Sequence, residues 1–185
     1  ELLEYLSPAL AKVGGTLVQA EDELASINMA LGASYGGVPS LTATSGPGLS
    51  LMIESLGLGV AAEVPVVVVD VMRTGPSTGL PTSVEQSDLM QAIYGSHGDC
   101  PRIVLAPKDV EDCFYVAFEA CQLARKYSCP VIILSDQALS SRIEAFHEPD
   151  LDKYWMEPQL DISPRGEDFK PYPLDKVTRH APPGS

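Results

Sequence analysis

Positive charge is scarce in this sequence, and it contains no long apolar run. Its 185 residues hold 12 Lys and Arg against 25 Asp and Glu, which gives a formal net charge of −13. A phosphate backbone and an anionic lipid surface would both repel such a chain. No run approaches the roughly 20 apolar residues that span a bilayer, and the start of the chain lacks a basic segment followed by an apolar one. We therefore expect no nucleic-acid partner, no membrane partner and a cytoplasmic location.

Cysteine is also sparse, and its spacing does not suit a metal. The four cysteines are Cys100, Cys113, Cys121 and Cys129, with no CxxC pair and no paired histidines. Zinc sites and iron–sulfur clusters need closely spaced ligands of these types. We expect no metal site and no cluster in this chain, but reduced and packed thiols, with Cys113 and Cys121 in the core.

Apolar residues, in contrast, are abundant and regularly arranged. They make up 45% of the chain and charged residues only 20%, which is typical of a globular domain. The four valines Val66 to Val69 show no alternation with polar residues, as in a central strand covered on both faces. Strand and helix patterns alternate, which predicts an α/β fold with a doubly wound parallel sheet and helices on both faces. The expected strands are 16–19, 38–44, 65–71, 102–106 and 131–134, and the expected helices are 1–13 (bent or restarted at Pro8), 21–35, 49–63, 87–94 and 110–127.

The alternating pattern ends near Asp136. We expect residues 1–136 to form one domain and residues 137–185, which are rich in proline, to form an extended tail or linker toward another domain. The sequence opens at Glu1 inside a helical pattern without a methionine. We therefore expect an N-terminally truncated fragment of a longer protein.

The loop that follows the valine strand is rich in polar side chains that a hydrophobic core does not need. Residues 70–88 hold one arginine, Arg73, together with several hydroxyls and Gly/Pro turns. Ligands of open α/β sheets bind at loops of this kind, at the carboxyl ends of the strands. The alternative is that the loop composition serves turn geometry alone, with Arg73 merely solvated.

Further candidates stand at the starts of two helices and in one loop. The segment SGPG (Ser45, Gly46, Pro47, Gly48) joins a strand to a helix, where glycines let a ligand approach the backbone; the alternative is a tight turn. The acids at Glu21 to Glu23 either complement a helix dipole or place one carboxylate in a crevice with a raised pKa. His97 is an acid–base candidate or a structural hydrogen bonder.

Four stretches taken together are specific: TATSGPGLSLM, VDVMRTGPSTGLPT, EQSDL and HGDCPRIVLAP. They resemble the α subunit of 2-oxoacid:ferredoxin oxidoreductases, especially the 2-oxoglutarate type, over the thiamine diphosphate pyrimidine-binding domain. The resemblance implies oxidative decarboxylation of a 2-oxoacid to an acyl-CoA, with coenzyme A as co-substrate and ferredoxin as electron acceptor.

The resemblance also implies roles for individual residues. Glu23, by its spacing ahead of Gly32, matches the glutamate that hydrogen-bonds the pyrimidine ring nitrogen, and Glu21 is the fallback. Arg73 and Thr82 match residues that hold the 2-oxoacid, and a guanidinium fork suits a carboxylate. The SGPG segment would contact the cofactor.

One expected motif is missing. Thiamine enzymes bind the diphosphate and magnesium through a Gly-Asp-Gly segment followed by an asparagine, and the nearest match here is Gly98, Asp99, Cys100. The resemblance therefore implies a hetero-oligomer whose β subunit supplies the diphosphate site, the magnesium and the iron–sulfur cluster. Two alternatives stay open: a non-oxidative thiamine diphosphate decarboxylase or synthase domain, and a non-catalytic ligand-binding or assembly domain.

Overall fold

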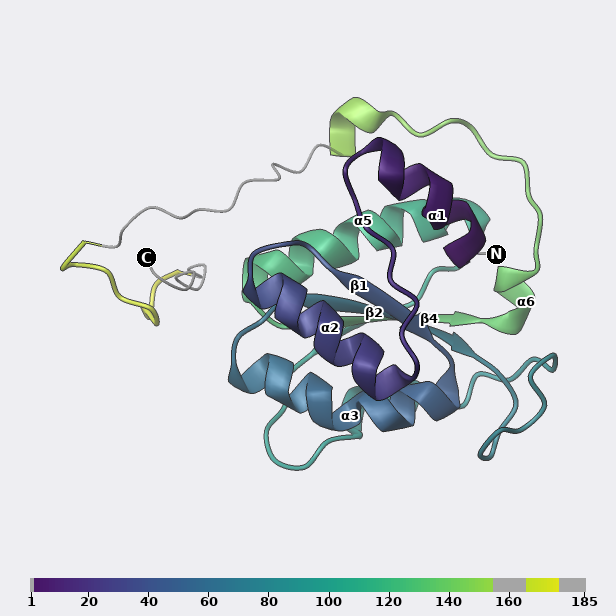
Figure 1. Cartoon of the computed structure of the whole chain (residues 1–185), viewed down its shortest axis with the longest axis horizontal. Helices are drawn as coiled ribbons and strands as arrows, with labels where there is room; N and C mark the ends of the chain where they lie inside the picture. Colours follow the sequence, from purple (N-terminus) through teal and green to yellow (C-terminus); the bar gives the residue numbers. More distant parts are fainter. Residues whose placement is uncertain (1, 155–165, 177–185) are drawn as a thin grey trace.

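A computed structural model describes residues 2–154 and 166–176 of the chain. Within these ranges, four parallel strands form one sheet in the order β1-β2-β4-β3 (Figure 1). The predicted parallel sheet between helices is confirmed. In chain order the elements are α1 (Leu2–Lys12), α2 (Glu23–Tyr35), β1 (Leu41–Thr44), α3 (Gly46–Ala61), β2 (Val66–Met72), α4 (Leu89–Tyr94), β3 (Ile103–Leu105), α5 (Val110–Tyr127), β4 (Pro130–Asp136), α6 (Gln137–Ser140) and a short 3-10 helix (Leu151–Tyr154).

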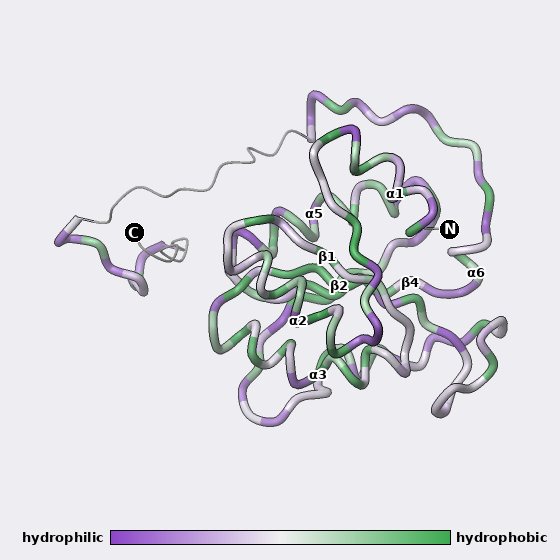
Figure 2. Tube along the Cα trace, in the orientation of Figure 1, coloured by the Kyte–Doolittle hydropathy of each residue, from purple (hydrophilic) through white to green (hydrophobic). Residues whose placement is uncertain are grey.

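Buried side chains form two clusters, one on each face of the sheet. On one face, α2 and α3 cover Val66 and Val68 of β2. On the other face, Val116 and Ala120 of α5 pack onto Val67. Successive valines of β2 therefore point to opposite, covered faces, which confirms the interpretation of the valine run. The central strands are coloured hydrophobic along most of their length in Figure 2.

Side-chain caps determine where two of the helices begin. Asp22 precedes α2 and accepts a 2.8 Å hydrogen bond from the N–H of Ala25. Asp109 does the same for α5 by accepting from the N–H of Asp112, also at 2.8 Å. The bounds of α5 and its cap agree with the prediction. In α2, the cap makes Glu23 the first helical residue, and this places its side chain at one end of the sheet.

Three expectations about local structure are wrong. The stretch 16–19 is not a strand: it is largely exposed, with Val18 at 61%, and pairs with none of the described strands. Of the two effects expected at Pro8, the restart is wrong, because α1 runs as one helix through it although proline removes an N–H donor. Cys113 is half-buried rather than enclosed in the core, while Cys121 packs beside the α5 cluster.

The start of the tail runs back over α5. After α6 the chain is extended, and the carboxylate of Glu144 accepts a hydrogen bond from the N–H of Val110 at 3.1 Å. Tyr154 then packs against rings of α5, with centroids 5.7 Å from Phe114 and 5.4 Å from Phe118. Glu144 and Tyr154 therefore attach the first part of the expected tail to α5, and residues 155–165 and 177–185 lie outside the described ranges.

Candidate functional site

The predicted site residues gather mostly at one edge of the sheet. All strands are parallel, so their carboxyl ends meet at the same edge, where open α/β sheets bind ligands. The register pairs Thr44 with Asp70, and Met72 with Asp136. The SGPG segment after β1, the loop after β2 and the end of β4 therefore lie along this edge.

Glu23 lies against the SGPG segment. A methyl group added to Gly48 would lie 2.8 Å from Oε1 of Glu23 and 1.9 Å from Oγ1 of Thr44. The carboxylate of Glu23 therefore occupies space that any side chain at position 48 would need. Glu23 is half-buried, whereas Glu21 is exposed and precedes the helix. Of the two acids considered from the sequence, the structure brings Glu23 to the segment.

Polar contacts along α2 fix the helix that carries this acid. Ser26 Oγ and Thr42 Oγ1 share a 2.6 Å hydrogen bond, which joins α2 to β1. Asn28 Nδ2 donates to Ser55 Oγ of α3 at 3.0 Å. Near the far end, Ser34 Oγ donates to the carbonyl of Pro65. These contacts tie α2 to the sheet and to α3 at three levels.

The SGPG segment forms the first turn of α3. Ser45 takes the N-cap position but makes no side-chain capping hydrogen bond with any described residue, and Pro47 lies in the first turn. Gly46 and Gly48 are both buried. The turn therefore has no side chain of its own at its two glycines, and the carboxylate of Glu23 lies against it. This arrangement can receive a flat heterocycle that offers a hydrogen-bonding nitrogen.

The loop that holds Arg73 and Thr82 folds back on itself. The N–H of Thr74 donates to the carbonyl of Ser83 at 3.1 Å and closes the loop. Arg73 directly precedes Thr74 and Thr82 directly precedes Ser83, so this hydrogen bond brings the two ends of the loop together. Gly79 has φ +59, and a methyl group there would lie 1.8 Å from the carbonyl oxygen of Thr74. Arg73 is half-buried, and its Nε has no hydrogen-bond partner among the described residues. Thr82 is exposed.

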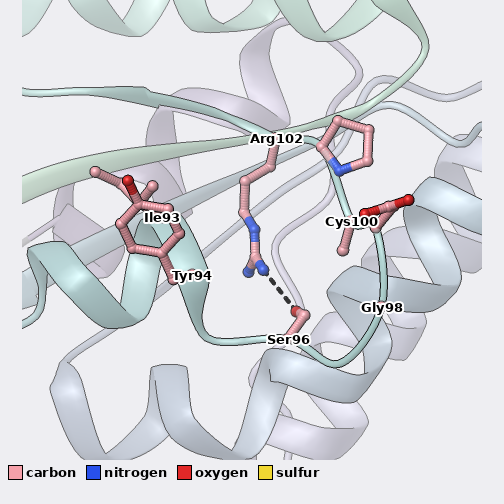
Figure 3. Close-up of a pocket in the computed structure, with 8 residues that line it drawn as sticks. Ile93, Tyr94, Ser96, Gly98, Cys100 and Arg102 are labelled. Atoms are coloured by element: carbon pink, nitrogen blue, oxygen red, sulfur yellow. Dashed lines mark hydrogen bonds between the residues drawn. The ribbon is translucent and has the colours of Figure 1, made fainter.

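His97 is not brought to this edge. It is exposed in the loop that enters β3, and the amino end of β3 pairs with the amino end of β4, so the loop lies at the opposite edge of the sheet. Next to it is a separate pocket of about 440 Å³ (Figure 3). There Arg102 Nη2 donates to Ser96 Oγ at 2.6 Å. The pocket is lined by Ile93, Tyr94, Ser96, Gly98, Asp99, Cys100, Pro101 and Arg102.

Two further acids near this edge of the sheet were not singled out from the sequence. Asp70 is fully buried in β2, and Asp88 is buried just before α4. Burial first, and then the charge of Asp88, raise the pKa of Asp70 to about 8. Burial also raises the pKa of Asp88. The available signal was a single acid inside an otherwise apolar strand, since a buried carboxyl needs a partner or a proton.

Asp136 closes the same edge as a capping residue. Its carboxylate accepts from the N–H of Leu139 at 2.8 Å and from Nε2 of Gln86 in the loop after β2. Burial would raise its pKa, but these hydrogen bonds outweigh it, and the pKa is lowered.

No three acids, histidines or cysteines of the described ranges cluster as a metal site would require. None of the helices in these ranges has the length and hydropathy to cross a membrane.

Comparisons with known proteins place this geometry in context. A family model described as pyruvate flavodoxin/ferredoxin oxidoreductase, thiamine diphosphate-binding, matches residues 1–179. The 2-oxoglutarate oxidoreductase subunit KorA of Mycobacterium tuberculosis is 51% identical over 160 residues, which are 86% of this chain and 24% of that protein. The 2-oxoglutarate synthase subunit KorA of Archaeoglobus fulgidus is 49% identical over 151 residues, which are 82% of this chain and 44% of that protein.

A solved structure is similar as well. It is a 2-oxoglutarate:ferredoxin oxidoreductase from Magnetococcus marinus with 2-oxoglutarate, coenzyme A and succinyl-CoA bound. It is 60% identical, with a TM-score of 0.72, and the match covers 74% of this chain and 24% of that one. The chain thus spans between about a quarter and just under half the length of these three relatives.

Proposed function

Because the chain belongs to the thiamine diphosphate-binding family of pyruvate flavodoxin/ferredoxin oxidoreductases, we propose that it is the pyrimidine-binding part of the α subunit of a 2-oxoglutarate:ferredoxin oxidoreductase. The whole enzyme would convert a 2-oxoacid and coenzyme A to an acyl-CoA and pass the electrons to ferredoxin. The named relatives support 2-oxoglutarate as the substrate.

One observation carries the proposal: the carboxylate of Glu23 packs against Gly48 in the SGPG turn. The methyl group that would clash there, 2.8 Å from Oε1, shows that the acid and the bare backbone lie in contact. The carboxyl of Glu23 and the glycine backbone together suit a pyrimidine ring. The ring nitrogens can hydrogen-bond to the carboxyl, and the flat face of the ring can pack on backbone that carries no side chain. Glu23 would exchange a proton with a ring nitrogen, and Ser45, Gly46, Pro47 and Gly48 would form the backbone wall.

The cofactor supplies the electron sink for decarboxylation when it is bound. The residues described above fit its pyrimidine half, since they combine a half-buried acid with two buried glycines. The chain has no Gly-Asp-Gly segment for a diphosphate. We assign the diphosphate, its magnesium and an iron–sulfur cluster to the β subunit.

Arg73 and Thr82 would hold the substrate carboxylate at the same edge of the sheet. Arg73 is half-buried, and its guanidinium carries several N–H donors that suit an anion. The hydroxyl of Thr82 is exposed. A planar guanidinium binds a carboxylate with two parallel hydrogen bonds, which a lysine cannot reproduce.

Exposed apolar side chains support a partner subunit. In α4, Met90 is 64% and Tyr94 71% exposed, and α3 leaves Leu51 49% exposed. Gln91 Nε2 donates to Ser50 Oγ at 2.7 Å, so these two helices are joined. Apolar surface of this kind marks protein contacts.

Free thiols at all four cysteines accord with a cytoplasmic location.

The test is co-expression of the complete α subunit with its β subunit, followed by viologen reduction with several 2-oxoacids. We expect reduction that requires both 2-oxoglutarate and coenzyme A. Glu23→Gln should lower kcat by about a hundredfold or more, as loss of a proton-transfer group does. Arg73→Lys should chiefly raise KM, by about tenfold. Glu54→Gln, an exposed acid on α3, is the matched control.

Two outcomes would contradict the proposal. Turnover of the Glu23→Gln enzyme equal to that of Glu54→Gln would remove Glu23 from the mechanism. Carbon dioxide release that needs neither coenzyme A nor an electron acceptor would favour the non-oxidative alternative.

A further inference from the structure

The two glycines of the SGPG turn face different carboxyl groups. Gly48 lies against Glu23, whereas a methyl group on Gly46 would lie 2.6 Å from Oδ2 and 2.9 Å from Oδ1 of Asp88. Asp88 is also near enough to Asp70 for its charge to raise the pKa of that acid. Two acids, Asp70 and Asp88, therefore lie beneath the turn, at a position that the proposed chemistry does not use.

Asp70 is enclosed on all sides. It is 0% exposed, and it points to the same face of the sheet as Val68 and Met72, under α3. Its register neighbours are Thr44 on β1 and Leu134 on β4, so neither flanking strand offers it a charge. No N–H or O–H group of another described residue donates to either of its carboxyl oxygens. An enclosed carboxyl in this position retains its proton, because ionisation without a compensating charge is costly.

The helix above the pair lacks a negative group of its own. Ser45 makes no capping hydrogen bond within the described residues, and the first turn of α3 contains no acid. A helix N-terminus carries a partial positive charge that a carboxylate stabilises. Asp88 lies against Gly46 at this position. One negative charge beneath the turn is therefore favourable, and two are not.

We propose that Asp70 and Asp88 are a positioning pair that shares one proton, keeps a single negative charge at the start of α3, and so holds the SGPG turn where the cofactor ring binds. This role rests on the function proposed above. Asp70 is the protonated partner and Asp88 the carboxylate. The raised pKa of Asp70, about 8, agrees with this division.

The pair should make the turn sensitive to pH. Besides each other, Glu85 is the charged group that acts on it, since Glu85 raises the pKa of Asp88. Ionisation of Asp70 would place two negative charges beneath Gly46. Since its folded pKa lies above the unfolded value of about 4, Asp70 favours folding below that value. This contribution is lost as the pH rises through about 8.

The test uses the complete α subunit with its partner subunit and the variants Asp70→Asn, Asp88→Asn and Asp99→Asn. Asp99 is exposed at the opposite edge and is the control. Thiamine diphosphate affinity by calorimetry and the unfolding midpoint are measured from about pH 6 to about pH 9. Infrared difference spectra report the carbonyl band of a protonated carboxyl.

In the wild type and in Asp99→Asn, the unfolding midpoint should fall as the pH rises from about 6 toward about 8 and level off above it, whereas the affinity should fall above about pH 8. Asp70→Asn should remove both falls, because its amide donates a hydrogen bond without ionising, and should also remove the carbonyl band at neutral pH. Asp88→Asn should weaken cofactor binding by about tenfold at neutral pH, because the charge at the turn is gone.

The proposal is overturned if Asp70→Asn keeps the wild-type pH dependence and carbonyl band, or if Asp88→Asn binds the cofactor as Asp99→Asn does. Failure of the wild-type complex to bind thiamine diphosphate at any pH would instead refute the proposed function. In that case the unfolding midpoints and the infrared band would still decide whether the pair holds a proton.

Discussion

Substitution of Gly48 by alanine offers a direct test of the arrangement around the turn. The new methyl group would lie 1.9 Å from Thr44 Oγ1 and 2.7 Å from Glu23 Cγ. Carbon atoms prefer separations of about 3.5–4.0 Å, so either the turn or the two side chains must move. Gly57, in the same helix, is the matched control, because a methyl group there would meet no described atom within 4 Å apart from its chain neighbours and the backbone of α3 itself.

The expected size of the effect follows from this comparison. Alanine is favoured over glycine in a helix by up to about 1 kcal/mol, and Gly57→Ala should gain most of that. Overpacking a filled site costs about 1–3 kcal/mol. The free energy of unfolding of Gly48→Ala should therefore be lower than that of Gly57→Ala by roughly that amount. If the strain displaces Glu23, cofactor affinity should fall by about five- to a hundredfold.

Urea unfolding of the complete α subunit measures the stability difference, and calorimetry on the complex measures the affinity. A second substitution identifies the source of the strain. Thr44→Ala removes the nearest oxygen, so it should restore part of the stability of Gly48→Ala but not the affinity, since Glu23 still meets the new methyl group. Equal stability and equal affinity of Gly48→Ala and Gly57→Ala would refute the contact between Glu23 and the turn.

Three other predictions concern the supports of the site. Asp22→Ala should destabilise the domain by about 1 kcal/mol in urea unfolding, because it removes the cap of α2. The exposed neighbour Glu21→Ala should have no such effect. Tyr154→Ala should cost about 1–2 kcal/mol through lost contacts with the rings of α5, while Phe146→Ala, 45% exposed in the same segment, should cost less. Because its folded pKa is lowered, Asp136 stabilises the fold above its unfolded pKa of about 4 and loses this effect as the pH falls further. Acid unfolding of Asp136→Asn should therefore lack this part of the pH dependence.

The fold was predictable wherever hydrophobic pattern and capping agreed. The bounds of α5 follow from an amphipathic run, a capping Asp109 and basic residues in the last turn. The valine run predicts a central strand because burial on both faces leaves no alternation. The stretch 16–19 has strand-forming residues, but a strand also needs a neighbour, and no described strand accepts its hydrogen bonds.

The site was predictable in part for a related reason. Motif order put the SGPG turn and Arg73 at the carboxyl edge, since topology alone decides this. The choice between Glu21 and Glu23 depended on where the helix begins, which Asp22 determines through its cap. The acids Asp70 and Asp88 are 18 positions apart in the sequence and come close only through packing. No local sequence pattern predicts that they are neighbours.

The three hydrogen bonds that tie α2 to the sheet and to α3 have a consequence for tuning the enzyme. A helix is a stiff rod, and Ser34 lies about 16 Å along it from Glu23. Its bond to the Pro65 carbonyl anchors the end of the rod that is remote from the acid. Small changes there, or at Asn28, would shift Glu23 along the helix axis without altering any group of the SGPG turn. If Glu23 has the role proposed above, substitutions at Ser34 or Asn28 should therefore change the reaction rate although neither residue adjoins the SGPG turn.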